Sequence, residues 1–127
     1  MMLKLLSVSS PHAVGVRLSG KVNHNDMDTI VNEVERKLKD EDRLGIYIEL
    51  DHFEGFTLRG FLRETRFALR YMGHITRAAM VGESRWFNRA STVITRFFPN
   101  VEIEHFTPIQ KDEALIWVAE KDVEHFS

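Results

Sequence analysis

Strand-like and helix-like segments alternate along the chain, and this alternation limits the fold more than any other feature of the sequence. Apolar residues at every second position predict strands, and apolar stripes at helical spacing predict helices. We predict strands at 1–8, 14–20, 43–50, 75–81 and 101–106, and helices at 26–38, 58–72, 84–98 and after Pro108. The order β-β-α-β-α-β-α-β-α implies one α/β domain over residues 1–127. Its mostly parallel five-stranded sheet would carry an antiparallel edge hairpin and be packed by helices.

Two local features refine this prediction. Asn25 is the expected N-cap of the first helix, because Asp26 and Asp28 follow where the helix dipole favours negative charge. The segment 51–56 is expected to be a loop between the third strand and the second helix.

The composition excludes several classes of protein. The chain has no cysteine, which excludes disulfides, thiolate catalysis and Cys-ligated zinc and fits a reducing cytosol. No apolar run approaches the roughly 20 residues of a membrane-spanning helix, and the N-terminus does not read as a signal peptide. The pI of about 6.3, without a recognition helix or an aromatic RNA-binding signature, argues against nucleic acid as a partner.

Catalytic and metal-binding patterns are also absent from the sequence. Gly82-Glu83-Ser84 resembles the start of a nucleophile elbow, but Trp86 stands where that turn needs a second glycine. The 6 histidines include no pair at i, i+4 spacing, which a helix-borne metal site uses. We therefore expect no catalytic residue, no metal and no cofactor.

Three segments resemble the SpoIIAA-like family. These are the strand-to-helix stretch 77–86, the strand 101–106 and the helix segment 113–118 with its Ala-x-x-Trp pattern. Gly20 and Asp26, which opens the first helix, also match the pattern of this family. The resemblance implies a fold similar to STAS domains, and more distantly to CRAL-TRIO lipid-transfer domains. It further implies a binding module without established chemistry.

One feature of STAS anti-sigma antagonists does not carry over. Those proteins present a phosphorylatable serine after Asp where the third strand meets the second helix, and this chain has no Asp-Ser pair there. Thr57 is the hydroxyl residue nearest to this junction. It is interpreted as a helix N-cap, with phosphorylation as the alternative.

The second predicted helix has three kinds of surface. At about 100° per residue, one face carries the residues expected to pack in the core: Leu58, Phe61, Leu62, Thr65, Ala68, Leu69 and Met72. A stripe of arginines runs along one edge of this face and forms a basic edge: Arg59, Arg63, Arg66 and Arg70. Phe67 and Tyr71 lie opposite the predicted core face and are expected to be exposed.

A similar basic flank is predicted on the third helix, formed by Arg85, Arg89 and Arg96. Arginine binds phosphate and carboxylate through a planar fork of donors. Beside exposed rings, arginines indicate a surface for anionic membrane lipids. The same residues also suit a protein partner or a homodimer, and charged helix stripes are commonly solvated faces.

A cluster of apolar residues lies near the carboxyl ends of the third and fourth strands, where open α/β sheets bind ligands. Its members are Phe53, Phe56, Phe61, Leu62, Trp86 and Phe87. Movement of the second helix on Gly55 and Gly73 would open a pocket between the second and third helices. The alternative is that these residues simply pack the core.

These observations lead to two hypotheses. The first is a non-enzymatic module that binds an apolar, lipid-like ligand beneath the second helix and associates with anionic membrane. Its expected location is the cytoplasm, with peripheral association at the inner membrane face. The alternative is a STAS-like regulatory module that docks a protein partner and is phospho-controlled near Thr57.

Overall fold

Five strands form one sheet with the spatial order β1-β2-β3-β4-β5. The structure is a computed structural model that describes residues 3–71, 73–97 and 101–120. Its elements are β1 (Leu3–Leu6), β2 (Ala13–Val22), α1 (His24–Leu38), β3 (Leu44–Phe56), α2 (Leu58–Tyr71), β4 (Ile75–Val81), α3 (Ser84–Phe97), β5 (Glu102–Phe106), the 3-10 turn η1 (Pro108–Gln110) and α4 (Lys111–Ala119). Strand β1 pairs antiparallel with β2, and all other strand pairs are parallel. This arrangement confirms the predicted fold class.

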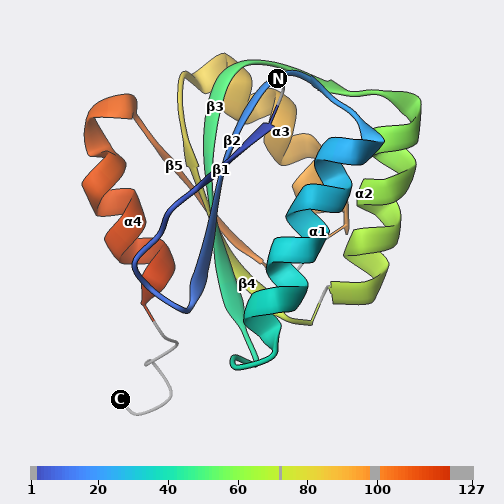
Figure 1. Ribbon diagram of the computed structural model, residues 1–127. Coiled ribbons are helices and arrows are strands. Elements are labelled where there is room, and N and C mark those ends of the chain that lie inside the picture. Colours follow the sequence, from blue (N-terminus) through green and yellow to red (C-terminus); the bar gives the residue numbers. More distant parts are fainter. Residues whose placement is uncertain (1–2, 72, 98–100, 121–127) are drawn as a thin grey trace.

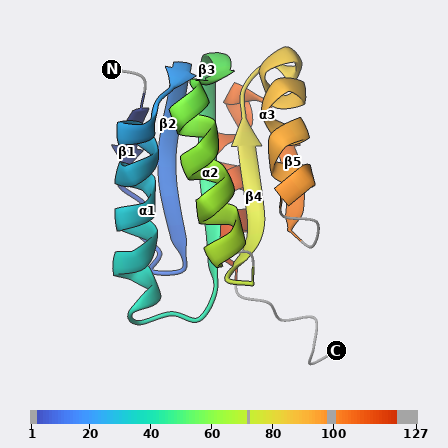
Figure 2. The same cartoon turned by 90° about the vertical axis from the view of Figure 1, so that its right-hand side faces the viewer.

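Helices cover both faces of the sheet. Figures 1 and 2 show α1, α2 and α3 on one face and α4 on the other. Side chains alternate along β3, so Ile46 and Ile48 join the core beneath α1 and α2, whereas Tyr47 joins the core beneath α4. Ile48 lies between Val16 of β2 and Met80 of β4. An apolar row therefore crosses the sheet beneath α1 and α2.

The N-cap of α1 is Asn23, and the prediction of Asn25 was wrong. The Asn23 side chain accepts a hydrogen bond from Asp26 N at 2.9 Å, and the Asp26 carboxylate accepts one from Asn23 N at 3.0 Å. This reciprocal pair is a capping box. Asn25 has an acid at the same spacing, Asp28, but β2 runs to Val22 and the helix begins immediately afterwards.

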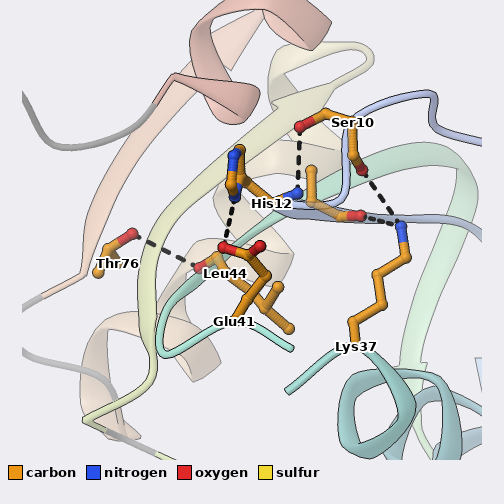
Figure 3. Close-up of polar contacts among 7 residues, drawn as sticks. Ser10, His12, Lys37, Glu41, Leu44 and Thr76 are labelled. Carbon is orange, nitrogen blue, oxygen red and sulfur yellow. Dashed lines mark hydrogen bonds and ion pairs between the residues drawn. The ribbon is translucent and has the colours of Figure 1, made fainter. Parts of the chain in front are cut away.

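Polar contacts hold the carboxyl end of α1 against the turn between β1 and β2 (Figure 3). Lys37 Nζ donates hydrogen bonds to the backbone oxygens of Ser10 and Ala13 at 3.3 and 2.5 Å. His12 Nδ1 lies 2.7 Å from the Glu41 carboxylate in the segment that follows the helix. Burial lowers the pKa of Lys37 below its ordinary value. These contacts fix α1 to the sheet, and α2 packs chiefly against α1.

Strand β3 is longer than predicted, so the expected loop at 51–56 was wrong. Its second half continues to pair with β2, through an irregular register at Gly20. Positive φ angles at Gly20 and Gly55, 61° and 111°, accommodate this irregular end. The turn-forming residue types suggested a loop, but Phe53 is buried and anchors the segment as strand.

Candidate ligand-binding site

The inward face of α2 is formed by residues spaced three and four apart. These are Gly60, Glu64, Phe67 and Tyr71, all of them buried. A Cβ at Gly60 would lie 2.4 Å from the backbone oxygen of Val22, so the glycine lets the first turn of α2 rest on the end of β2. At the other end, the Tyr71 hydroxyl donates a hydrogen bond to Glu35 of α1. The two ends of α2 thus set its rotation.

This rotation corrects the predicted faces of α2. Phe67 and Tyr71 were expected to be exposed, but their exposed fractions are 6% and 7%. Leu58 and Leu62 were expected in the core, but they are 76% and 58% exposed. The helix carries apolar residues on two faces, and the one that contains Gly60 can approach the sheet most closely. The exposed-aromatic part of the predicted surface was therefore wrong.

Two of the four arginines on the predicted basic edge of α2 form ion pairs with acids of α1, and the other two do not within the described structure. Arg63 Nη1 lies 2.5 Å from the Asp28 carboxylate, and Arg70 Nη2 lies 3.8 Å from Glu35, so both bind acids of α1. Arg59 and Arg66 are exposed and form no ion pair with an acid in the described part of the chain. They lie on the outer side of α2, beside exposed Leu58 and Leu62.

The basic flank predicted on α3 is described only at its start. Arg85 Nε lies 3.1 Å from the Glu83 carboxylate, and the guanidinium stands 4.3 Å from the centre of the Trp86 ring. The side chains of Arg89 and Arg96 lie outside the described part of the structure.

An apolar cavity of about 80 Å³ lies beneath α2, between the α1–α2 pair and the sheet. Its walls come from three strands, both helices and the residue before β5. The lining residues are Val16, Leu18, Met27, Ile30, Ile46, Ile48, Phe56, Glu64, Phe67, Ile75, Ala78 and Val101. The cavity thus lies toward α1, whereas the sequence suggested a pocket toward α3.

Glu64 brings a carboxyl group into this apolar wall. Its side chain is 5% exposed, and its Oε1 atom is buried without a hydrogen-bond partner in the described structure. Burial raises the pKa of Glu64 to about 7, since an apolar environment disfavours the ionised form. Most buried polar atoms in proteins have a partner. An unpaired carboxyl oxygen beside an apolar cavity is therefore an available acceptor for a bound molecule.

The predicted pocket residues are not all brought together. Phe56 lines the cavity, Phe53 is buried nearby in an edge-on contact with Phe56 at 5.7 Å, and Leu62 points to the outside. Trp86 and Phe87 are partly buried and pack against the same core. The side chain of Phe61 lies outside the described part of the structure.

Thr57 caps α2, as interpreted from the sequence. Its Oγ1 accepts a hydrogen bond from Gly60 N at 3.0 Å, which satisfies one of the free donors of the first turn.

A second hollow of about 300 Å³ lies beside the carboxyl end of β4. Arg17 and Lys111 contribute cations to its walls, and Glu49 contributes a carboxylate. Glu49 binds Arg17 at 2.9 Å and accepts a hydrogen bond from the Tyr47 hydroxyl at 2.8 Å, and Lys111 lies 3.9 Å away. Because these charges are paired with one another, the cavity under α2 is the stronger candidate site.

Sequence reasoning missed Glu64 and the two acids of α1 that hold α2. A signal for Glu64 was present, since it is one of only two acids between Thr57 and Phe98, a segment with eight arginines. Its position between Gly60 and Phe67 at helical spacing also places it on their face of the helix. Asp28 and Glu35 gave no comparable signal, because acids on a helix surface are usually solvated.

Two further findings bear on the possible chemistry. Within the described residues, no group of three or more His, Asp or Glu is arranged to hold a metal ion. Among the described helices, none combines the length and the apolar character needed to cross a membrane.

Comparisons with known proteins agree with this architecture. The family model described as SpoIIAA-like matches residues 13–119. A crystal structure of a protein with a SpoIIAA-like fold from Shewanella loihica PV-4 superposes with a TM-score of 0.69 at 19% sequence identity, covering 91% of each chain. At that identity the likeness concerns the fold alone. No curated protein matches the chain.

Proposed function

Because the chain belongs to the SpoIIAA-like family, we propose that it is a non-enzymatic module that binds an apolar small molecule in the cavity beneath α2. The family is generally non-enzymatic, which supports a binding or regulatory module. The observation that carries the proposal is the cavity itself, whose described lining residues are all apolar except for Glu64. Apolar cavities of this kind stay free of water and accept apolar molecules.

The size of the cavity limits the ligand. An engineered apolar cavity of about 150 Å³ accepts benzene, so about 80 Å³ suits a molecule of a few heavy atoms or one end of a longer chain. Drug-sized ligands occupy pockets of roughly 300–1,000 Å³. A lipid-like ligand would therefore require α2 to move away from the sheet.

The attachment of α2 supports such a movement. Its polar contacts run sideways to α1, through Arg63 with Asp28 and Tyr71 with Glu35. Two glycines flank the helix: Gly55 has a φ of 111°, and a Cβ at Gly73 would meet nothing within 4 Å. We propose that α2 widens the cavity by turning at Gly73, while the irregular end of β3 at Gly55, which pairs with Lys21 of β2, gives way at the other end of the helix.

The ligand proposal is tested by filling the cavity. Xenon is a suitable apolar probe, and its binding is read from the NMR shifts of the Ile48 and Ile75 methyl groups. We expect xenon to shift both methyl groups in the natural protein. Ala78→Leu, which adds a side chain to the cavity wall, should abolish the shifts.

The matched control is Leu62→Ala, which removes a side chain that is exposed on the outer face of the same helix. This variant should respond to xenon as the natural protein does. Xenon shifts that persist unchanged in Ala78→Leu, or that are absent from the natural protein, contradict the proposal.

A second candidate function, peripheral association with anionic membrane, is supported by the outer face of α2. Leu58 and Leu62 are exposed there beside Arg59 and Arg66. Leucines on an exposed helix face can enter the lipid interface while arginines bind headgroups. Leu58 and Leu62, and not Phe67 and Tyr71, are thus the exposed apolar residues of the proposed membrane surface.

Vesicle co-sedimentation tests this second candidate. The double variant Arg59→Glu/Arg66→Glu should weaken binding to phosphatidylglycerol vesicles at least about tenfold, since each basic residue near an anionic surface contributes about 1 kcal/mol. The control Lys4→Glu/Lys39→Glu makes the same charge change at exposed positions outside α2. Equal loss in both variants, or equal binding to neutral phosphatidylcholine vesicles, contradicts a specific membrane surface.

A further inference from the structure

We propose that Glu64 is the polar anchor of the cavity and selects an apolar alcohol, whose hydroxyl group donates a hydrogen bond to the buried carboxyl oxygen. The inference rests on the proposed ligand-binding function and specifies the chemical class of the ligand. It is carried by the position of Glu64, which lines an apolar cavity with its Oε1 atom buried and unpartnered in the described structure.

Among the described residues, the walls of the cavity offer the buried Oε1 atom of Glu64 no hydrogen-bond partner. The other described residues that line it have apolar side chains. The neighbouring arginine, Arg63, forms an ion pair with Asp28 of α1. Leaving a buried acceptor without a donor destabilises the protein. A ligand that brings its own donor removes that cost.

A water molecule would be a poor substitute for such a ligand. Buried waters typically make two to four hydrogen bonds. Beside Glu64 a water would find one polar side chain, and the remaining walls described here are apolar. A molecule with one hydroxyl group and an apolar body matches this distribution of partners.

The charge of the site favours a hydroxyl group over an acid or an amine. A second carboxyl group would meet Glu64 at close range, and two neighbouring carboxylates oppose each other's ionisation. An ammonium group would have to give up its hydration on entering an apolar cavity that offers it a single acceptor among the described residues. A hydroxyl group is neutral and can donate to a carboxyl oxygen whether Glu64 is protonated or ionised.

Two isomeric probes separate the hydrogen bond from apolar contact. 1-Butanol and methyl propyl ether have the same atoms and similar size, but the ether has no donor. Their affinities are compared through the NMR shifts of the Ile48 and Ile75 methyl groups, which line the cavity. We expect the natural protein to bind 1-butanol about tenfold more tightly, the effect of one buried hydrogen bond.

Two variants assign the preference to Glu64. Glu64→Leu should bind both probes equally, because it has no acceptor. Glu64→Gln should keep a preference for 1-butanol, because its amide oxygen still accepts, and this variant also controls for any loss of structure in the leucine variant.

The outcomes distinguish the two proposals. Equal affinity of the natural protein for both probes overturns the anchoring role of Glu64 while leaving an apolar ligand site intact. A preference for 1-butanol that persists in Glu64→Leu overturns it as well. Binding of neither probe overturns the ligand-binding function itself, and the anchor with it.

Discussion

Glu64 places a carboxyl group among apolar side chains, and this position links the stability of the protein to pH. Burial raises the pKa of Glu64 to about 7 from an ordinary value of 4.5. Among the described residues that line the cavity, Glu64 alone titrates. Between these two pH values the unfolded chain has lost a proton that the folded chain still holds. Ionisation of Glu64 therefore weakens the folded state as the pH rises.

We predict that the contribution of Glu64 to the free energy of unfolding falls between pH 4.5 and about 7 and is constant above that range. The full shift corresponds to about 3 kcal/mol. Glu64→Gln cannot ionise, so its stability relative to the natural protein should rise by about this amount between pH 4.5 and about pH 8. Urea denaturation measures the difference. The same difference at both pH values would show that the carboxyl group is not buried without a partner.

The sequence indicated Glu64 as unusual but not what it does. An isolated acid among arginines is visible in the sequence, whereas its burial depends on how α2 is turned about its axis. Helical spacing alone left two apolar faces available on this helix. The close approach allowed by Gly60 and the hydrogen bond from Tyr71 to Glu35 select between them, and both depend on neighbouring elements.

At the scale of the element, Gly60 allows the first turn of α2 to pack directly against the end of β2. A Cβ at Gly60 would lie 2.4 Å from the oxygen of Val22, closer than the two atoms can approach, and 3.1 Å from the backbone carbon of Asn23, which is a tight contact. Both of these atoms belong to the backbone, so neither can turn aside as a flexible side chain would. The beginning of α2 would have to move instead.

We predict that Gly60→Ala lowers the free energy of unfolding by about 1–3 kcal/mol, as overpacking does. In an unconstrained helix the same change stabilises by up to about 1 kcal/mol. Gly73→Ala is the control, because a Cβ there meets nothing within 4 Å and should leave stability unchanged or slightly raised. Chemical denaturation of both variants checks this. A Gly60→Ala protein as stable as Gly73→Ala would mean that α2 does not rest on β2 in this way.

Strands and helices were predicted with different success for physical reasons. A run of small and branched residues that stops at Gly82 located β4, whose predicted range 75–81 is the observed Ile75–Val81. The end of β3 was missed because Asp51 and Gly55 are turn-forming types, and pairing with β2 overrides that preference. Asn25 and Asn23 offer equivalent capping signals, and the length of β2 decides between them.

At the scale of the whole molecule, the fold could be predicted and the site could not. The order of strands and helices follows from local patterns, and crossover rules then fix a mostly parallel sheet. The cavity is volume left between two helices and a sheet, so it depends on the distances between elements far apart in the sequence. Of the predicted pocket residues whose side chains the structure describes, Phe56 lines the cavity.

The central claim is that an apolar molecule binds beneath α2. Intermolecular NOEs between bound 1-butanol and the protein test it most directly, because they locate the ligand. We predict NOEs to the Ile48 and Ile75 methyl groups and the Phe67 ring, which line the cavity, and none to exposed Leu58 and Leu62. NOEs confined to Leu58 and Leu62, or to the buried Val118 of α4 on the other face of the sheet, would contradict the claim.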